Sequence, residues 1–237
     1  MCRPLQIRKY QKCHCHCDSV KNKLVSKIYK YLLALKSNTY IIYNSTATAN
    51  FWHTSSNQNK YRVIYNGILI QEVSNSCTET AFLRKKIFKS ETQVVIGLIG
   101  RINRLKGHAI LIEALKDIQK ELYKVVFVGS TVENQEHYLE DLKNKIHRDG
   151  LEKNVVFLDF QKDIAKIWNA IDIAAVPSTE PESFGLVAIE AMAAKKPVIA
   201  SKIGGLQEVV VDQETGFLVT PNVAKELKEA LEKLIQD

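Results

Sequence analysis

The sequence predicts an α/β fold in which helices cover both faces of a parallel sheet. From about residue 90 to the end, short apolar runs typical of strands alternate with segments in which apolar residues recur at helical spacing. Each helical segment is long enough to carry the chain back across the sheet, as parallel strands require. The apolar runs are almost continuous, which is typical of strands buried on both faces.

The elements of this domain follow in a regular order. Runs rich in Val and Ile predict strands over 94–100, 124–129, 154–159, 172–177, 197–201 and 215–219. Apolar residues at a period of 3.6 predict the helices between them. These helices are expected over 108–122, 134–150 and 163–171, after Ser183, after Gly204-Gly205 and from about 223.

The part of the chain before this domain is less regular. Residues 1–18 are expected to form a disordered tail. Residues 67–90 are expected to form a linker, because the polar stretch "SNSCTET" within them shows neither the alternation of a strand nor the spacing of a helix. Residues 19–66 form a short separate piece, and its predicted elements are a helix over 20–36 and strands over 39–45 and 62–66. The α/β domain then occupies residues 91–237.

Composition and charge narrow the class of protein. The chain has 237 residues, 46% hydrophobic and 25% charged, with a net charge of +7. It has neither a membrane-spanning run nor the apolar stretch of a signal peptide, so we expect a cytoplasmic protein. The positive charge favours phosphates, nucleotides or peripheral association with an anionic membrane face. Basic residues are scattered without interleaved aromatics, so nucleic acid is not expected as a partner.

Four of the five cysteines lie near the start, at Cys2 and in the alternating tract "CHCHC" of residues 13–17. A soft-metal clip and a disordered tail both account for this tract. Alternation does not match the C-x(2-4)-C pairs of tetrahedral zinc sites, which favours the tail. Whether the tract binds metal stays open.

The segment "TEPESFGLVAIEAM" (179–192) follows a strand, at the edge where open parallel sheets bind ligands. With Ser183 as N-cap, Phe184, Gly185 and Leu186 form the first helical turn, whose N–H groups lack intrahelical partners. The turn is either a simple connection or an anion cradle. Glu190 lies on the apolar part of the helix and needs a partner, because burying an unpaired carboxylate is costly. That partner is an Arg or Lys, or the vicinal hydroxyls of a ligand.

Two further turns lie at the same predicted edge. Arg101 and Lys106 follow the first strand of the domain and form either a solvated basic loop or a clamp for a diphosphate. Gly204-Gly205 forms either a turn with positive φ or a close approach of the backbone to a ligand. His108 is expected to be an ordinary first-turn residue.

Together these motifs resemble the donor-binding domain of retaining GT-B glycosyltransferases, the group called glycosyl transferases group 1 or family 4. The resemblance covers roughly residues 60–237. The matching motifs are Asn66-Gly67, Gly-Arg-(x4)-Lys-Gly from Gly100, Glu-Ser-Phe-Gly-Leu-(x3)-Glu-Ala from Glu182, Gly-Gly-(x2)-Glu-Val-Val from Gly204 and Thr-Gly-Phe-Leu-Val from Thr215. The resemblance implies that the α/β domain is Rossmann-like and forms the C-terminal half of a GT-B fold.

The resemblance also implies roles for the candidate residues. Arg101 and Lys106 would bind the diphosphate of a UDP- or GDP-sugar, Glu190 the ribose, and Glu182 would lie beside the donor sugar. The catalytic candidates are thus Glu182, Arg101 and Lys106, and the donor-binding candidates add Phe184, Gly185, Leu186, Glu190, Gly204 and Gly205. Glu182 and Glu190, separated by seven residues, resemble the paired-glutamate motif of the family. Glu180 does not fit this spacing and is expected to be a solvated loop acid.

The implied activity is transfer of the sugar to a glycan or lipid-linked acceptor with retention. We expect neither a metal nor a cofactor, because cations and a helix N-terminus stabilise the leaving phosphate and no D-x-D motif stands in a suitable place. The sequence departs from the family in that residues 19–66 form only a remnant of the acceptor domain. The alternative is therefore a truncated, non-catalytic nucleotide-sugar-binding module that needs a separate acceptor-domain chain. An unrelated doubly wound domain is the third interpretation.

Overall fold

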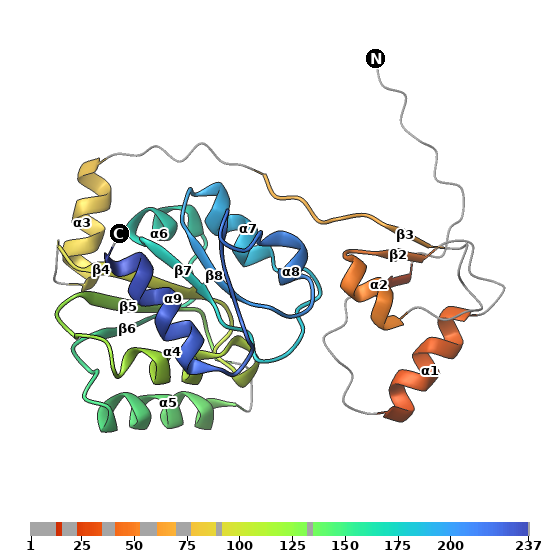
Figure 1. Ribbon diagram of the computed structural model, residues 1–237, viewed down its shortest axis with the longest axis horizontal. Coiled ribbons are helices and arrows are strands. Elements are labelled where there is room, and N and C mark those ends of the chain that lie inside the picture. Colours follow the sequence, from red (N-terminus) through yellow and green to blue (C-terminus); the bar gives the residue numbers. More distant parts are fainter. Residues whose placement is uncertain are drawn as a thin grey trace, which may run out of the picture.

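The computed structural model describes residues 13–15, 23–34, 41–52, 61–69, 77–88, 92–131 and 135–236. They form a six-stranded and a three-stranded sheet, each with its own helices (Figure 1). Within these ranges, no helix has both the length and the apolar character of a membrane span.

The six-stranded sheet is parallel throughout, which confirms the predicted fold class. Its strands are β4 (Val94–Ile99), β5 (Tyr123–Val128), β6 (Val155–Leu158), β7 (Ile173–Val176), β8 (Val198–Ser201) and β9 (Gly216–Val219). Their order is β6-β5-β4-β7-β8-β9, so the winding reverses between β4 and β7. This is the order of a Rossmann-like sheet, and the crevice beyond β4 and β7 is where such sheets hold ligands.

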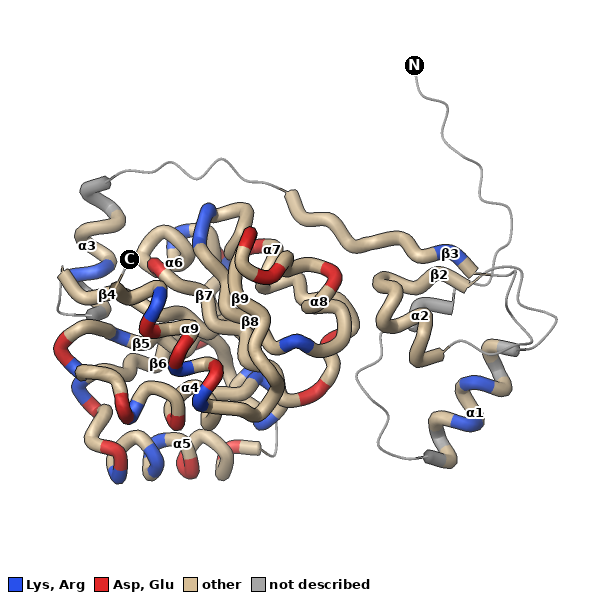
Figure 2. Tube along the Cα trace, in the orientation of Figure 1, with Lys and Arg blue, Asp and Glu red and all other residues tan. Residues whose placement is uncertain are grey.

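Helices cover both faces of this sheet (Figure 1). The helices on one face are α4 (His108–Leu115), α5 (Glu136–Arg148) and α9 (Ala224–Gln236), and those on the other are α3 (Cys77–Phe88), α6 (Ile164–Ala170), α7 (Leu186–Ala193) and α8 (Leu206–Val209). Side chains of β4 alternate between the two cores, since Ile96 and Leu98 pack on the α4 face and Val95 on the α7 face. Figure 2 shows charged residues on the helices and loops, whereas the strands of this sheet are almost free of them.

The described residues of the smaller unit form three parallel strands and two helices. Its elements are β1 (Cys13–Cys15), α1 (Lys23–Ala34), β2 (Ile41–Tyr43), α2 (Thr46–Trp52) and β3 (Tyr61–Val63). Residues 13–15 were expected in the disordered tail, but they pair with β2 through backbone hydrogen bonds, which do not depend on side-chain pattern. The rest of the predicted tail, and the side chains of the Cys/His tract, lie outside the described residues.

The predicted linker over 67–90 also differs from the structure, because residues Cys77–Phe88 form α3. Leu83 and Ile87 pack against the core on the α7 face. The Arg84 guanidinium donates two hydrogen bonds to the carboxylate of Asp172, at 2.7 and 3.1 Å. The sequence pattern of this helix is weak, and the Arg84–Asp172 ion pair adds a long-range contact to the apolar packing of Leu83 and Ile87.

His108 is the first residue of α4, as expected, and it is fully buried. Its ring packs edge-on against Phe127 and Tyr138, with centroid distances of 5.0 and 6.4 Å. Burial disfavours the charged imidazolium and lowers the pKa of His108 to about 4. The folded protein therefore holds this ring neutral throughout the neutral pH range.

We predict that His108 makes the protein less stable in mild acid. The unfolded chain binds a proton at the ordinary pKa of 6.5 and the folded chain only near 4, so stability is complete above 6.5 and falls as the pH drops through that window. Between about pH 7.5 and 4.5, the wild type should lose about 2–3 kcal/mol more free energy of unfolding than His108→Gln. Urea denaturation at both pH values measures the difference. His137→Gln, which changes an exposed histidine of α5, should lose as much as the wild type; an equal loss in His108→Gln would contradict the prediction.

Candidate functional site

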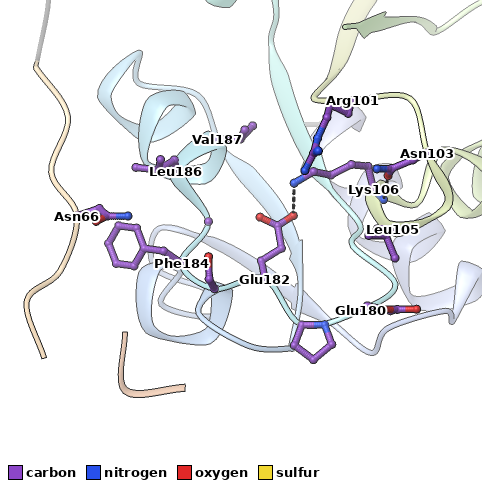
Figure 3. A pocket seen from close by; sticks show the side chains of 13 residues that line it. Asn66, Arg101, Asn103, Leu105, Lys106, Glu180, Glu182, Phe184, Leu186 and Val187 are labelled. Carbon is purple, nitrogen blue, oxygen red and sulfur yellow. Dashed lines mark hydrogen bonds and ion pairs between the residues drawn. The ribbon is translucent and has the colours of Figure 1, made fainter. Parts of the chain in front are cut away.

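A cavity of about 340 Å³ opens at the carboxyl edge of the large sheet. Three segments line it: the turn between β4 and α4, the loop between β7 and α7, and the extended chain after β3. Figure 3 shows Asn66, from the last of these, on the opposite side from Arg101 and Lys106. The lining residues are Asn66, Arg101, Asn103, Leu105, Lys106 and residues 180–187.

The β4–α4 turn brings its cations to the cavity through a defined local structure. The Asn103 side chain accepts a hydrogen bond from the Lys106 amide (3.2 Å) and so caps the short 3-10 turn Arg104–Lys106. Gly107 follows with φ 76°, and a Cβ there would lie 1.9 Å from the carbonyl oxygen of Pro177. Glycine therefore permits this turn to lie directly against the β7–α7 loop.

Lys106 and Glu182 form an ion pair inside the cavity. The Lys106 Nζ donates to Glu182 Oε1 at 2.7 Å, and the two side chains are only 22% and 15% exposed. The Ser178 hydroxyl also donates to Glu182 Oε1. Arg101 lies beside this pair (Figure 3), so the cluster has two cations for one carboxylate. Such a cluster suits an anionic ligand with several oxygens.

The β7–α7 loop differs in one respect from the sequence prediction. Helix α7 begins at Leu186 and its N-cap is Gly185, with φ 98°, not Ser183. Phe184 and Gly185 thus belong to the turn before the helix. The left-handed conformation of Gly185 sets this boundary, and a Cβ there would lie 2.6 Å from a methyl carbon of Leu206. The first turn of α7, at Leu186 and Val187, still lines the cavity.

Gly204 and Gly205 pack beneath this loop and are not among the residues that line the cavity. A Cβ on Gly204 would lie 2.4 Å from the Glu182 carbonyl oxygen, and one on Gly205 would lie 2.5 Å from the Phe184 Cα. The Gly205 amide also donates to the Glu182 carbonyl at 2.8 Å. These glycines therefore approach the loop backbone and support it from below, and the close approach to a ligand expected at them stays a prediction.

Glu190 lies on α7, half-buried, and outside the cavity lining. Within the described ranges, no ion pair involves its carboxylate, so the Arg or Lys partner considered from the sequence is not found there. Burial raises the pKa of Glu190 above its usual value. Its binding role stays a prediction.

The cavity also contains residues that the sequence interpretation missed. Glu180, expected to be a solvated bystander, lines it, as do Asn103 and Leu105. The signal for Asn103 was its place two residues after Arg101, because Asn favours capping positions in tight turns. Among the residues with described side chains, no group of three or more His, Cys, Asp or Glu could hold a metal ion; the expectation of metal-free chemistry stays a prediction.

Comparison with known proteins places these features in a family. The model of the family described as glycosyl transferases group 1 matches residues 79–237. An uncharacterised glycosyltransferase of Methanocaldococcus jannaschii is 33% identical over 185 residues, which cover 76% of this chain and 46% of that protein. The D-inositol 3-phosphate glycosyltransferase of Corynebacterium aurimucosum is 37% identical over 151 residues, covering 60% and 35%. The chain thus spans less than half the length of these relatives.

Solved structures extend the similarity beyond the family match. HepE of Anabaena, in complex with UDP and glucose, superposes with a TM-score of 0.86 and 32% identity, over 94% of this chain and 61% of that one. The HepE complex with UDP-glucose gives the same TM-score and identity. The C-terminal domain of a glycosyl transferase group 1 protein from Francisella tularensis has a TM-score of 0.62 and 32% identity, over 72% and 89% of the two chains.

We predict that Gly205→Ala destabilises the fold through the β7–α7 loop alone. Gly205 has φ −66°, which alanine adopts freely, so the new Cβ acts only by its contacts with Phe184 and Ser183. The free energy of unfolding in urea should fall by about 1–3 kcal/mol, as for other overpacked sites. Gly67→Ala is the control, because its Cβ would meet nothing within 4 Å. Equal stability of the two variants would show that the loop yields without cost.

Proposed function

The chain belongs to the glycosyl transferases group 1 family, and on that premise we propose that its cavity binds the diphosphate of a nucleoside-diphosphate sugar. The observation that carries the proposal is the Arg101, Lys106 and Glu182 cluster, at the point where the winding of the sheet reverses. UDP is the nucleotide we favour over GDP, because HepE, with 32% identity, has been solved with UDP and with UDP-glucose.

The diphosphate would lie against the cations and the start of α7. The Arg101 guanidinium offers a planar fork of donors and Lys106 a compact charge, and the first-turn amides of Leu186 and Val187 carry the positive end of the helix dipole. These groups stabilise negative charge as it develops on the departing phosphate, with no metal required. Glu182 would accept hydrogen bonds from hydroxyls of the donor sugar. Its ion pair with Lys106 holds the lysine in place before the donor binds.

Glu190 would bind the ribose of the nucleotide. Its carboxylate has no ion-pair partner in the described part of the chain and is half-buried on the helix that leads away from the cavity. A pair of vicinal hydroxyls would donate hydrogen bonds to both of its oxygens and so offset the free-energy cost of burying the charge.

We propose that the complete reaction is transfer of the sugar, with retention, to a glycan or lipid-linked acceptor. The acceptor side would include residues 19–66, and Asn66 already reaches the cavity from this part of the chain. The second candidate is a donor-binding module that works with a separate acceptor-domain chain, since the match covers 61% of HepE. Turnover of UDP-glucose by the isolated chain would favour the first candidate, and turnover only with an added acceptor domain the second.

The diphosphate site predicts a direct effect on nucleotide affinity. Isothermal titration of UDP-glucose should show binding to the wild type, and Arg101→Met or Lys106→Met should weaken it by about tenfold or more, because each removes a charge-assisted hydrogen bond. Lys225→Met, which changes an exposed lysine of α9, should bind like the wild type. Absence of binding for UDP-, GDP- and other nucleotide sugars alike would overturn the proposed function.

The ribose site predicts opposite effects on affinity and stability. Glu190→Gln should weaken UDP-glucose binding, yet melt no lower than the wild type at neutral pH. The reason is that burial raises the pKa of Glu190, so the folded state loses stability as pH rises from the ordinary pKa through the raised one, and at neutral pH this cost is present in the wild type and absent from the variant. Thermal melts without ligand and titrations with it give both quantities. A variant that melts lower but binds normally would assign Glu190 a purely structural role.

A further inference from the structure

Glu208 on α8 binds the smaller unit of the chain by three hydrogen bonds. Its Oε2 accepts hydrogen bonds from the amide of Thr46 at 2.9 Å and from the hydroxyl of Tyr65 at 3.0 Å. Its Oε1 accepts the amide of Ala47 at 2.6 Å. We call these four residues the Glu208 clasp; its hydrogen bonds connect α8 with the start of α2.

The clasp completes the N-terminus of α2. The first N–H groups of a helix have no intrahelical acceptor. Ser45 Oγ accepts a hydrogen bond from the amide of Thr48 at 2.9 Å. The Glu208 carboxylate accepts hydrogen bonds from the two preceding amides, those of Thr46 and Ala47. Burial would raise the pKa of Glu208, but the hydrogen bonds from Ala47, Thr46 and Tyr65 outweigh it and hold the pKa below its usual value. The carboxylate is therefore charged at neutral pH, where the helix dipole favours it.

Tyr65 of the clasp, and two residues close to the clasp in the chain, also contact or approach the loop that lines the cavity. The Tyr65 ring stacks on Phe184 with centroids 5.9 Å apart. The Thr48 hydroxyl donates to the carbonyl of Ser183 at 3.1 Å. Asn66, next to Tyr65 in the chain, lines the cavity itself and faces Phe184 (Figure 3). Glu208 lines no part of that cavity, so any effect on a ligand there passes through these contacts.

Helix α8 therefore supports the Ser183–Phe184 loop in two ways. Its cap residue, Gly205, packs beneath Phe184, and Glu208, three residues further on, holds Tyr65 and α2 against Ser183 and Phe184. We propose that Glu208 is a positioning residue, whose clasp fixes the segment 46–66 on the Ser183–Phe184 loop and thereby sets the affinity of the cavity for its ligand. The part that concerns affinity rests on the proposed function, and the part that concerns position does not.

Hydrogen exchange tests the positional part directly. In Glu208→Gln, one carboxylate oxygen becomes an NH₂ that faces N–H donors, so the amides of Thr46 and Ala47 should exchange about tenfold faster or more. Peptides containing Ser183 and Phe184 should also exchange faster, while β4 and β5 keep the wild-type rate. Glu214→Gln, the same change at an exposed acid of the same domain, is the control. Unchanged exchange at Thr46 and Ala47 would overturn the clasp.

Titration of UDP-glucose tests the coupling to the ligand. Glu208→Gln should weaken binding about fivefold or more, and Tyr65→Phe, which keeps the stacking ring but loses the hydroxyl, should weaken it in the same direction. The double variant should be weaker than Glu208→Gln by less than the effect of Tyr65→Phe alone, because the hydroxyl and the carboxylate share one bond. Faster exchange with unchanged affinity would overturn the coupling. A wild type that binds no nucleotide sugar would refute the proposed function instead. The hydrogen-exchange rates of the Ser183–Phe184 loop in Glu208→Gln would still decide whether Glu208 positions that loop.

Discussion

The β7–α7 loop is held between two turns that only glycine permits to come so close. On one side, Gly107 brings the β4–α4 turn against Pro177; on the other, Gly204 and Gly205 support the backbone of Glu182 and Phe184. A side chain at these glycines would meet backbone atoms, which cannot rotate away. The cavity owes its shape to these contacts, because Lys106 and Glu182 come from the two loops thus brought together, 76 residues apart in the chain.

The ion pair between Lys106 and Glu182 has a chemical consequence. Two partly buried charges are costly to desolvate and repay that cost only with good geometry and further hydrogen bonds. Here the 2.7 Å contact and the Ser178 hydroxyl supply both. Arg101 lies beside the pair as a second cation, while the lysine is already oriented by its carboxylate partner. Such groups need little reorganisation when negative charge arrives, which is the condition for electrostatic stabilisation of a leaving phosphate.

Specific long-range hydrogen bonds join the two units of the chain and fasten α3 to the larger unit. The Glu208 carboxylate lies 162 residues from Thr46 in sequence, and Arg84 of α3 lies 88 residues from Asp172. Both contacts use a carboxylate with several donors, and both fasten a segment with a small apolar core or face. Hydrophobic burial holds the large sheet together, and charge-assisted hydrogen bonds act with a few apolar contacts to fix how the smaller segments lie on it.

The order of strands and helices in the large domain followed from the sequence, because apolar periodicity reports which faces of an element are buried. Local pattern failed at β1, whose pairing uses backbone groups, and at α3, whose apolar contacts are supplemented by an ion pair to a residue 88 positions away. The N-cap of α7 was misplaced because Ser183 is a good cap by residue type, while the φ of Gly185 sets the boundary. By itself the sequence determined the fold class, the family resemblance and the chemistry available to the site, since these depend on residue types and their spacing. Only the tertiary structure decided that Lys106 pairs with Glu182, that Gly204 and Gly205 support a loop, and that Glu208 reaches α2, because each depends on which loops meet at one edge of the sheet.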